Sequence, residues 1–132
     1  MINYLKYKKK NIRSITNSKY NAHSNPLFYE TKLLKIQDII EVELARFSYQ
    51  YQHSALPNSL KNLFRSNESM HQYNTRQKRL PRIEKHTRAI FNKSFLNKSI
   101  INWSMIKQDI KNLKTLDNFT RKLSMDKINN YA

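Results

Sequence analysis

The central part of the chain carries a dense run of cations beside aromatic side chains. Between residues 76 and 93 one acid, Glu84, faces the basic residues Arg76, Lys78, Arg79, Arg82, Lys85, Arg88 and Lys93. Tyr73 and Phe91 lie within or next to this run. Cations that follow a phosphate backbone, next to aromatic rings that stack on bases, are typical of proteins that hold single-stranded nucleic acid. We therefore predict a nucleic-acid-binding segment here.

Polar side chains precede these cations and allow two interpretations. Asn74, beside Tyr73, and its neighbours Gln72 and Thr75 could bond to base edges or phosphates. An Asn-Thr pair in a loop can equally satisfy its own backbone. Both interpretations stay open for Asn74 and Thr75, whereas the cations favour binding.

The net charge of the whole chain points the same way. Its 132 residues contain 25 Lys and Arg against 9 Asp and Glu, a formal charge of +16. Self-repulsion on this scale is relieved by a polyanion, so the expected partner is RNA or DNA, bound nonspecifically through electrostatics. An anionic membrane surface ranks second. A genome rich in A+T, which inflates Lys, Asn, Ile and Tyr codons, would also explain the composition without any binding function.

Several chemistries lack the residues that they need. The chain has no cysteine and no glycine, which excludes disulfides, cysteine zinc sites and glycine-rich phosphate loops. Its acids form no close pair that would be aimed at a metal, and its four histidines are scattered. We therefore expect no enzyme activity from the chain by itself, and neither a metal site nor a cofactor. Without glycine, turns with positive φ must fall to Asn, Asp or Lys.

The terminus and the hydropathy pattern bear on localisation. No apolar run approaches the roughly 18 residues of a membrane span. The first five residues are followed by lysines and not by an apolar core, so they do not form a signal peptide. We expect an intracellular protein that does not enter a membrane, in the nucleus or the cytoplasm.

The strongest helical pattern lies just before the basic segment. From Leu33 to about His53, apolar residues recur at spacings of three and four: Leu33, Ile36, Ile40, Leu44, Phe47 and Tyr51. This helix is predicted to be the structural spine, with Phe47, Tyr49 and Tyr51 in the core and its rim. Glu41 and Glu43 are two positions apart, hence on different faces, and are interpreted as solvated charges.

Weaker patterns predict the remaining elements. They are a basic helix to about Ser18, a linker over 21–26, a short helix begun by Pro57, a helix over about Ser94–Met105, and a last helix from Leu116 to about Asn129. Thr115 is the expected N-cap of the last helix. The basic residues expected on its outside are Lys111, Lys114, Arg121, Lys122 and Lys127.

Together these elements predict one all-α domain over residues 1–132. It is a small basic helical domain of about four to five helices with a long irregular central loop. Its parts are a basic N-terminal helix (1–20), a helical spine (27–65), a basic irregular segment (66–93) and C-terminal helices (94–129).

Short segments follow one another along the second half of the chain: His71-Gln72-Tyr73-Asn74-Thr75-Arg76, Leu80-Pro81-Arg82, Ser94-Phe95, Asn102-Trp103, Ile110-Lys111 and Leu116-Asp117-Asn118-Phe119. In order and spacing they resemble the C-terminal tail of LINE-type (non-LTR) retrotransposon reverse transcriptases. The preceding part resembles the region before that tail, through Ile12-Arg13-Ser14-Ile15-Thr16, Asn25-Pro26-Leu27-Phe28, Leu34-Lys35-Ile36-Gln37-Asp38-Ile39, Ala45-Arg46-Phe47, Tyr49 and Leu56-Pro57.

The resemblance implies a fragment of an RNA-directed DNA polymerase that holds template RNA or target DNA, with the upstream polymerase domains as partners. The catalytic Tyr-x-Asp-Asp of that family is absent, so no catalytic residue carries over. The family's usual glycine before the tryptophan is absent too, and Trp103 is followed by Ser104-Met105-Ile106 in place of asparagine and a leucine-proline pair. Two alternatives remain: a non-functional remnant of a truncated element, and an autonomous small helical nucleic-acid-binding protein.

Overall fold

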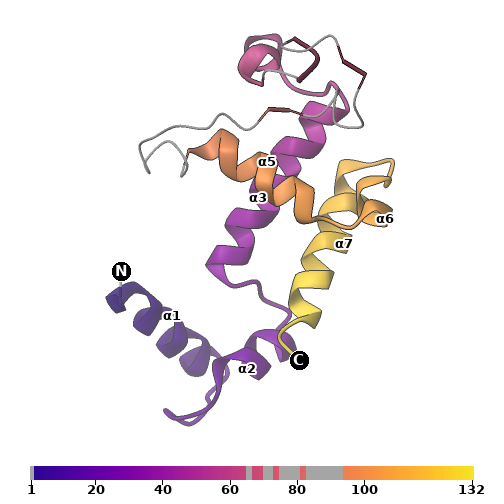
Figure 1. Ribbon diagram of the computed structural model, residues 1–132. Helices are drawn as coiled ribbons and strands as arrows, with labels where there is room; N and C mark the ends of the chain where they lie inside the picture. The colour runs from indigo at the N-terminus through magenta and orange to yellow at the C-terminus, as the bar shows by residue number, and fades with distance from the viewer. Residues whose placement is uncertain (1, 65–66, 70–72, 75–80, 83–93) are drawn as a thin grey trace.

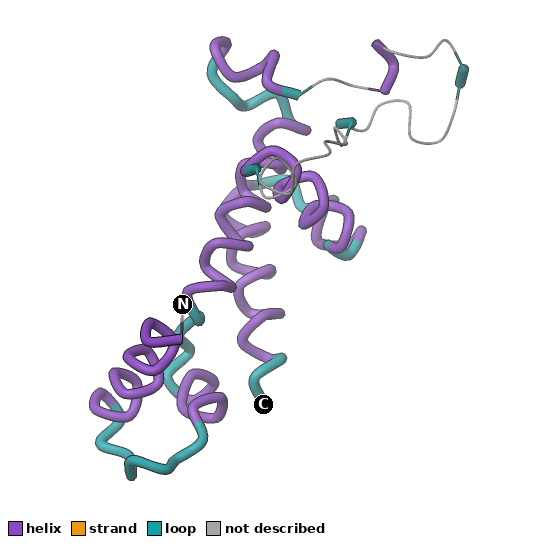
Figure 2. The backbone as a smooth tube through the Cα atoms, turned by 60° about the vertical axis from the view of Figure 1, so that its left-hand side comes forward, coloured by secondary structure: helices purple, strands orange, loops and turns teal. Residues whose placement is uncertain are grey.

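The computed structural model describes residues 2–64, 67–69, 73–74, 81–82 and 94–132. Their α-helices are α1 (Ile2–Ile15), α2 (Ser24–Glu30), α3 (Ile36–Gln52), α5 (Phe95–Met105), α6 (Gln108–Lys111) and α7 (Leu116–Asn129). Two 3₁₀ helices, η1 (Asn58–Leu63) and η2 (Asn67–Ser69), follow α3. No strand occurs in this described part (Figures 1 and 2), which confirms the all-α fold class. None of its helices is both long and apolar enough to cross a membrane.

Helix α3 is the spine of the structure. Helix α5 crosses it, and α7 lies along it (Figures 1 and 2). At the other end of the molecule α1 pairs with α2, and α2 reaches α7. The predicted role of the strongest helical pattern is therefore confirmed.

The core lies where α3, α6 and α7 meet. Phe119 of α7 and Ala45 of α3 are both 0% exposed, and Val42, Tyr49, Ile110 and Leu123 complete the buried cluster. The ring of Phe119 lies 4.6 Å from that of Tyr49 and 5.9 Å from that of Trp103, measured between centroids. The Tyr49 hydroxyl donates to the Leu113 carbonyl at 2.6 Å, so this buried polar group is satisfied.

The buried face of α3 differs from the predicted stripe. Leu44 and Tyr49 are buried as predicted, but Ile40, expected inside, is 55% exposed. Val42 and Ala45, which lie outside the predicted stripe, are buried instead. Apolar residues cover a wide arc of the first half of this helix, so their spacing alone could not show which side of that arc is buried. Ala45 is 0% exposed on the buried face, where its small side chain lets neighbouring elements pack closely against α3.

Helix boundaries follow local chemistry. The side chains of Ser94 and Thr115 accept hydrogen bonds from the Asn97 and Asn118 amides, at 3.4 and 3.3 Å, so the predicted Thr115 cap is confirmed. The predicted linker over 21–26 is wrong in its second half, because α2 begins at Ser24. Pro26 is tolerated there since first-turn amides have no partner within the helix.

Three helices end in Schellman motifs without glycine. Asn17, Lys32 and Ser54 have φ of 50°, 54° and 54°. In each motif the next amide bonds back to the helix, as in Ala55 N to Gln50 O at 2.8 Å. Asn and Lys were the expected substitutes for glycine, and Ser54 adds a third residue type.

Glycine at these positions is expected to stabilise the protein. Ser54→Gly and Lys32→Gly should each raise the free energy of unfolding by about 1 kcal/mol, because the Cβ clash of the left-handed conformation disappears. Asn17→Gly should gain less, because Asn tolerates this region. Urea denaturation measures the effect. Gln52→Gly, at the helical end of α3, is the control and should destabilise by roughly 0.5–1 kcal/mol; equal losses in all variants would contradict the assignment.

Candidate nucleic-acid interface

The two flanks of the basic segment meet on one aromatic ring. Phe64, before the segment, and Phe95, after it, lie with ring centroids 5.7 and 4.8 Å from Phe47 of α3. Tyr51, one turn further along α3, lies 4.3 Å from Phe64. The spine therefore holds the residues that flank the segment near each other, although Phe64 and Phe95 are about 31 positions apart in sequence.

Three of the predicted contact residues lie in the described part of the chain. Tyr73 is 79% exposed, and Asn74 and Arg82 are also exposed, so all three are accessible to a ligand. Pro81, next to Arg82, lines a small pocket with Tyr51 and Phe64. The other six residues lie outside the described residues: Arg76, Lys78, Arg79, Lys85, Arg88 and Lys93. Their assignment stays a prediction.

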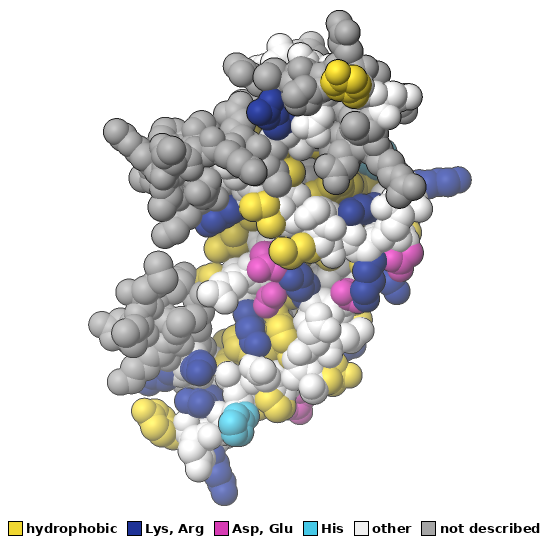
Figure 3. All heavy atoms as spheres, viewed as in Figure 1, with side chains coloured by type: hydrophobic (Ala, Val, Ile, Leu, Met, Phe, Trp, Pro, Cys, Tyr) yellow, Lys and Arg dark blue, Asp and Glu magenta, His cyan; other side chains and the backbone are white. Residues whose placement is uncertain are grey.

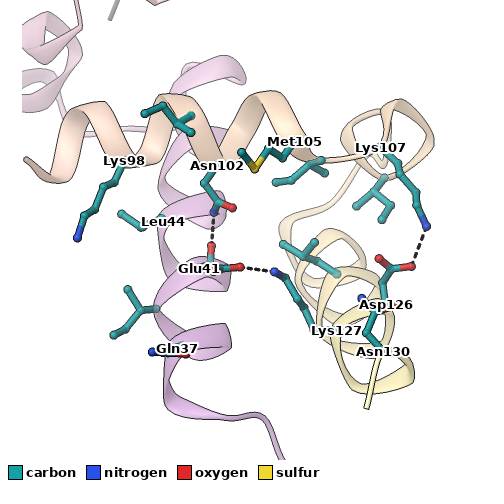
Figure 4. A pocket seen from close by; sticks show the side chains of 15 residues that line it. Gln37, Glu41, Leu44, Lys98, Asn102, Met105, Lys107, Asp126, Lys127 and Asn130 are labelled. Carbon is teal, nitrogen blue, oxygen red and sulfur yellow. Dashed lines mark hydrogen bonds and ion pairs between the residues drawn. The ribbon is translucent and has the colours of Figure 1, made fainter. Parts of the chain in front are cut away.

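Helix α5, which receives the end of the basic segment, is locked onto α3 by polar contacts. Asn102 donates to the backbone carbonyl of Glu41 at 2.6 Å (Figure 4). The Ser48 hydroxyl lies 3.1 Å from the carbonyl of Ser99, a residue that is 0% exposed. Two serines at the crossing point allow the helices to approach closely. In the sequence, the only indication of this close crossing is the presence of small residues, Ser48 and Ser99, within otherwise apolar helices.

Beside this crossing lies an open groove between α3, α5 and α7, with a volume of about 670 Å³. Ile40, Ile101 and Met105 expose apolar surface in it. Figure 4 shows that the Glu41–Lys127 ion pair joins α3 to α7 there, and that Lys107 pairs with Asp126 at 3.1 Å. Two of its three lysines are paired with these acids, and most of the other lining residues are apolar or amides, so the groove is a poor site for a polyanion.

The burial of Lys127 and Glu41 differs from the prediction. Lys127 was predicted on the outside of the last helix and Glu41 as a solvated charge, but both are half-buried and paired with each other. Lys127 also lies 3.8 Å from Asp38. Its position four residues after the buried Leu123 places it on the inner face of α7. Lys127 therefore serves the helix interface and is not free to bind phosphate.

Tyr131, just after α7, joins the same cluster. Its hydroxyl donates to Asp38 and accepts from the Lys35 amide at 3.1 Å. The ammonium of Lys35 lies 4.0 Å from the centre of its ring. Burial, together with the hydrogen bond to Asp38, raises the pKa of Tyr131 to about 12. The cluster fastens the end of the chain to the start of α3.

This pKa predicts a loss of stability at high pH. Between the ordinary tyrosine pKa of about 10 and the folded value of about 12, the unfolded chain loses the proton while the folded chain keeps it. The stabilisation is complete below pH 10 and is lost as pH rises to 12. Urea titrations should show the advantage of wild type over Tyr131→Phe shrinking across this window; a constant difference would contradict the assigned hydrogen bond.

Exposed cations are spread over several elements. Lys114, Arg121 and Lys122 are exposed, as predicted for the outside of the last helix. Lys111 instead lies 5.4 Å from the centre of the Trp103 ring, and burial lowers its pKa. On the face drawn in Figure 3, Lys and Arg side chains also gather at the lower end, over α1 and α2.

The described residues contain no group of three or more His, Asp or Glu that could hold a metal ion. No known protein family, curated protein or solved structure matches this chain. The case for a function therefore depends on the residues themselves.

Proposed function

We propose that this chain is the C-terminal, nucleic-acid-contacting tail of a LINE-type reverse transcriptase, and that it has no polymerase activity by itself. The observation that carries the proposal is the ordered series of segments from Ile12 to Phe119 that resembles this tail, in a chain of formal charge +16. A charge of this size favours a polyanionic partner. The proposed partners are RNA or DNA and the upstream polymerase domains, inside the cell, in the nucleus or the cytoplasm.

The structural roles of the resembling residues support the proposal. Trp103 packs near Phe119 in the core, Ser94 caps α5, and Asn102 ties α5 to α3. The resembling segments also supply these buried residues: Ile12, Leu27, Ala45, Tyr49, Leu56, Ile110 and Phe119. Segments that a family shares are expected to include the residues that build its fold, because core packing tolerates little change.

The proposed binding mode is electrostatic and follows the basic segment. The aromatic contacts of Phe47 hold Phe64 and Phe95, which flank that segment, near each other. Arg76, Arg79 and Arg82 lie three residues apart along it. Neutralised phosphates release counterions, so affinity should fall steeply as salt rises.

A binding assay across salt concentrations tests this proposal. The triple change Arg76→Ala, Arg79→Ala, Arg82→Ala should weaken binding to RNA and DNA of any sequence. It should also reduce the slope of log affinity against log salt by up to roughly 2 for single strands, at about 0.7 per lost contact. The control removes the same charge elsewhere: Lys114→Ala just before α7, with Arg121→Ala and Lys122→Ala on α7. Affinity that does not depend on salt would refute the proposal, and equal effects in both triple variants would refute the role of the central segment.

The main alternative is a remnant of a truncated element without selected activity. The absent glycine and the altered residues after Trp103 favour it. A decayed chain should lose cooperative folding, so a sharp thermal unfolding transition would argue against it. Sequencing the DNA and transcript upstream of Met1 separates these cases: an in-frame Tyr-x-Asp-Asp supports the polymerase, and an unrelated promoter there supports an autonomous binding protein.

A further inference from the structure

The turn between α1 and α2 displays an aromatic ring to solvent. Tyr20 is 78% exposed, and it occupies the second position of a turn that is closed by a hydrogen bond from Ala22 N to Lys19 O at 3.0 Å. We call residues 19–22 the Tyr20 turn. Isolated exposed apolar residues are common and need no explanation, so exposure alone would mean little. The surroundings of the ring are what set Tyr20 apart.

A cation with fixed geometry supports the ring. The Nε of Arg13 donates to the Ala22 carbonyl at 2.8 Å, which ties the end of α1 to the Tyr20 turn. The guanidinium carbon of the same residue lies 5.8 Å from the centre of the Tyr20 ring, within range of a cation–π interaction. Arg13 is half-buried, so it holds the ring in place while most of the ring stays open to solvent.

The backbone that leads into the turn is also well bonded. Asn17 adopts φ of 50° at the end of α1, and the Ser18 amide donates to the Arg13 carbonyl at 2.9 Å. The hydroxyls of Thr16 and Ser18 lie 2.8 Å apart. A ring presented on a fixed backbone loses little freedom when it binds, which improves affinity.

Cations surround this turn. Lys9 and Lys10 are exposed and lie one helical turn before Arg13, at spacings of four and three that place them on its side of α1. Lys19, adjacent to Tyr20, is exposed as well. No acid precedes Glu30 in the sequence, so the local field is positive throughout. Figure 3 shows dark-blue side chains over this end of the molecule.

We infer that the Tyr20 turn, with Lys9, Lys10 and Lys19, is a second binding site for single-stranded nucleic acid, separate from the basic segment. An unpaired base stacks on the ring of Tyr20, and the adjoining phosphates pair with the lysines. This inference rests on the proposed function. It adds a second binding site and specifies that the nucleic acid bound there is single-stranded. A guanidinium beside an aromatic ring favours a flat π-system as the ligand, because ring, cation and base can stack in series.

An anionic membrane is the competing ligand, since Ile15 at the end of α1 is also 69% exposed and could enter a bilayer. The helical hairpin formed by α1, the Tyr20 turn and α2 would then lie on the membrane surface. Stacking is favoured because the supported ring is a single tyrosine fixed by Arg13, whereas membrane insertion relies on a broad apolar face. The two ligands make different demands on Tyr20. A base needs the aromatic ring, and a bilayer needs only apolar bulk.

Anisotropy titrations of the full 132-residue chain with a labelled single-stranded oligonucleotide test the site. Tyr20→Ala should weaken single-strand binding by roughly 5- to 150-fold, which corresponds to the typical free energy of one stacked base. Tyr20→Phe keeps the ring and should bind as wild type does. Tyr20→Ala should leave binding to duplex of the same length unchanged, because paired bases are not available for stacking. Circular dichroism checks that the exposed substitution leaves the helices intact.

Tyr29 provides the matched control. It is a second exposed tyrosine of the same hairpin, 45% exposed and next to Glu30. Tyr29→Ala should leave single-strand affinity unchanged. The double change Lys9→Gln, Lys10→Gln should lower the salt slope by up to about 1.4, at roughly 0.7 per phosphate contact.

The outcomes separate the two claims. Salt-dependent binding that Tyr20→Ala leaves unchanged, or that Tyr29→Ala weakens equally, overturns this inference and leaves the proposed function standing. Wild-type protein that binds no RNA or DNA overturns both. Tighter binding to phosphatidylserine vesicles than to the oligonucleotide, with Tyr20→Leu as effective as wild type on vesicles, assigns the turn to membranes and also overturns the inference.

Discussion

Replacing Phe119 with alanine is expected to lower the free energy of unfolding by about 3–5 kcal/mol. The side chain is fully buried and packs between the rings of Tyr49 and Trp103, so its removal leaves a cavity where α3, α5 and α7 meet. A protein of this size has a total stability on the order of 5–15 kcal/mol, so the variant loses a large share of it and should unfold at a markedly lower temperature than wild type. Thermal melting followed by circular dichroism measures the change.

Met125→Ala is the control on the same helix. Met125 is 42% exposed, and its truncation should cost less than about 1 kcal/mol. A loss of similar size in both variants would show that α7 does not pack against α3 through Phe119.

Replacing Ser99 with leucine is expected to separate α5 from α3. Ser99 is 0% exposed and its carbonyl lies 3.1 Å from the Ser48 hydroxyl, so no space exists for a larger side chain. Overpacking of a close helix contact costs typically 1–3 kcal/mol, and we expect the upper end of this range because Ser99 is fully buried at the crossing of α3 and α5. The displaced α5 should also lose the hydrogen bond from Asn102 to Glu41.

Ser99→Ala separates size from hydrogen bonding. The Ser99 hydroxyl bonds only to the Leu96 carbonyl of its own helix among the described contacts, at 2.8 Å, so its removal should cost less than about 1 kcal/mol. Urea denaturation of both variants gives the comparison. Equal stability of the two variants would argue against the close crossing.

Most of the helices could be predicted from interactions between residues close in the sequence. The spine, the Ser94–Met105 helix and the final helix with its Thr115 cap follow from contacts three and four residues apart, which the sequence displays directly. Because the chain has no glycine, we also expected other residues to adopt positive φ, as Asn17 and Lys32 do. The start of α2 was missed because Pro26 and its neighbours are typical both of turns and of a first helical turn.

Charge, composition and the series of resembling segments led to a nucleic-acid partner, and that prediction needed no tertiary structure. For the basic segment, the structure adds the exposure of Tyr73, Asn74 and Arg82 and the aromatic contacts that join its flanks.

The sequence by itself determined the all-α class, the helix periods and the positive charge, because each depends on residue types or on neighbours within one helical turn. Only the tertiary structure decided which face of α3 is buried, where Lys127 and Tyr131 bind, and that Arg13 supports Tyr20. Contacts of Lys127 and Tyr131 join residues 86 and 96 positions apart. Which groups meet at such separations depends on the packing of whole helices, and local spacing carries no information about it.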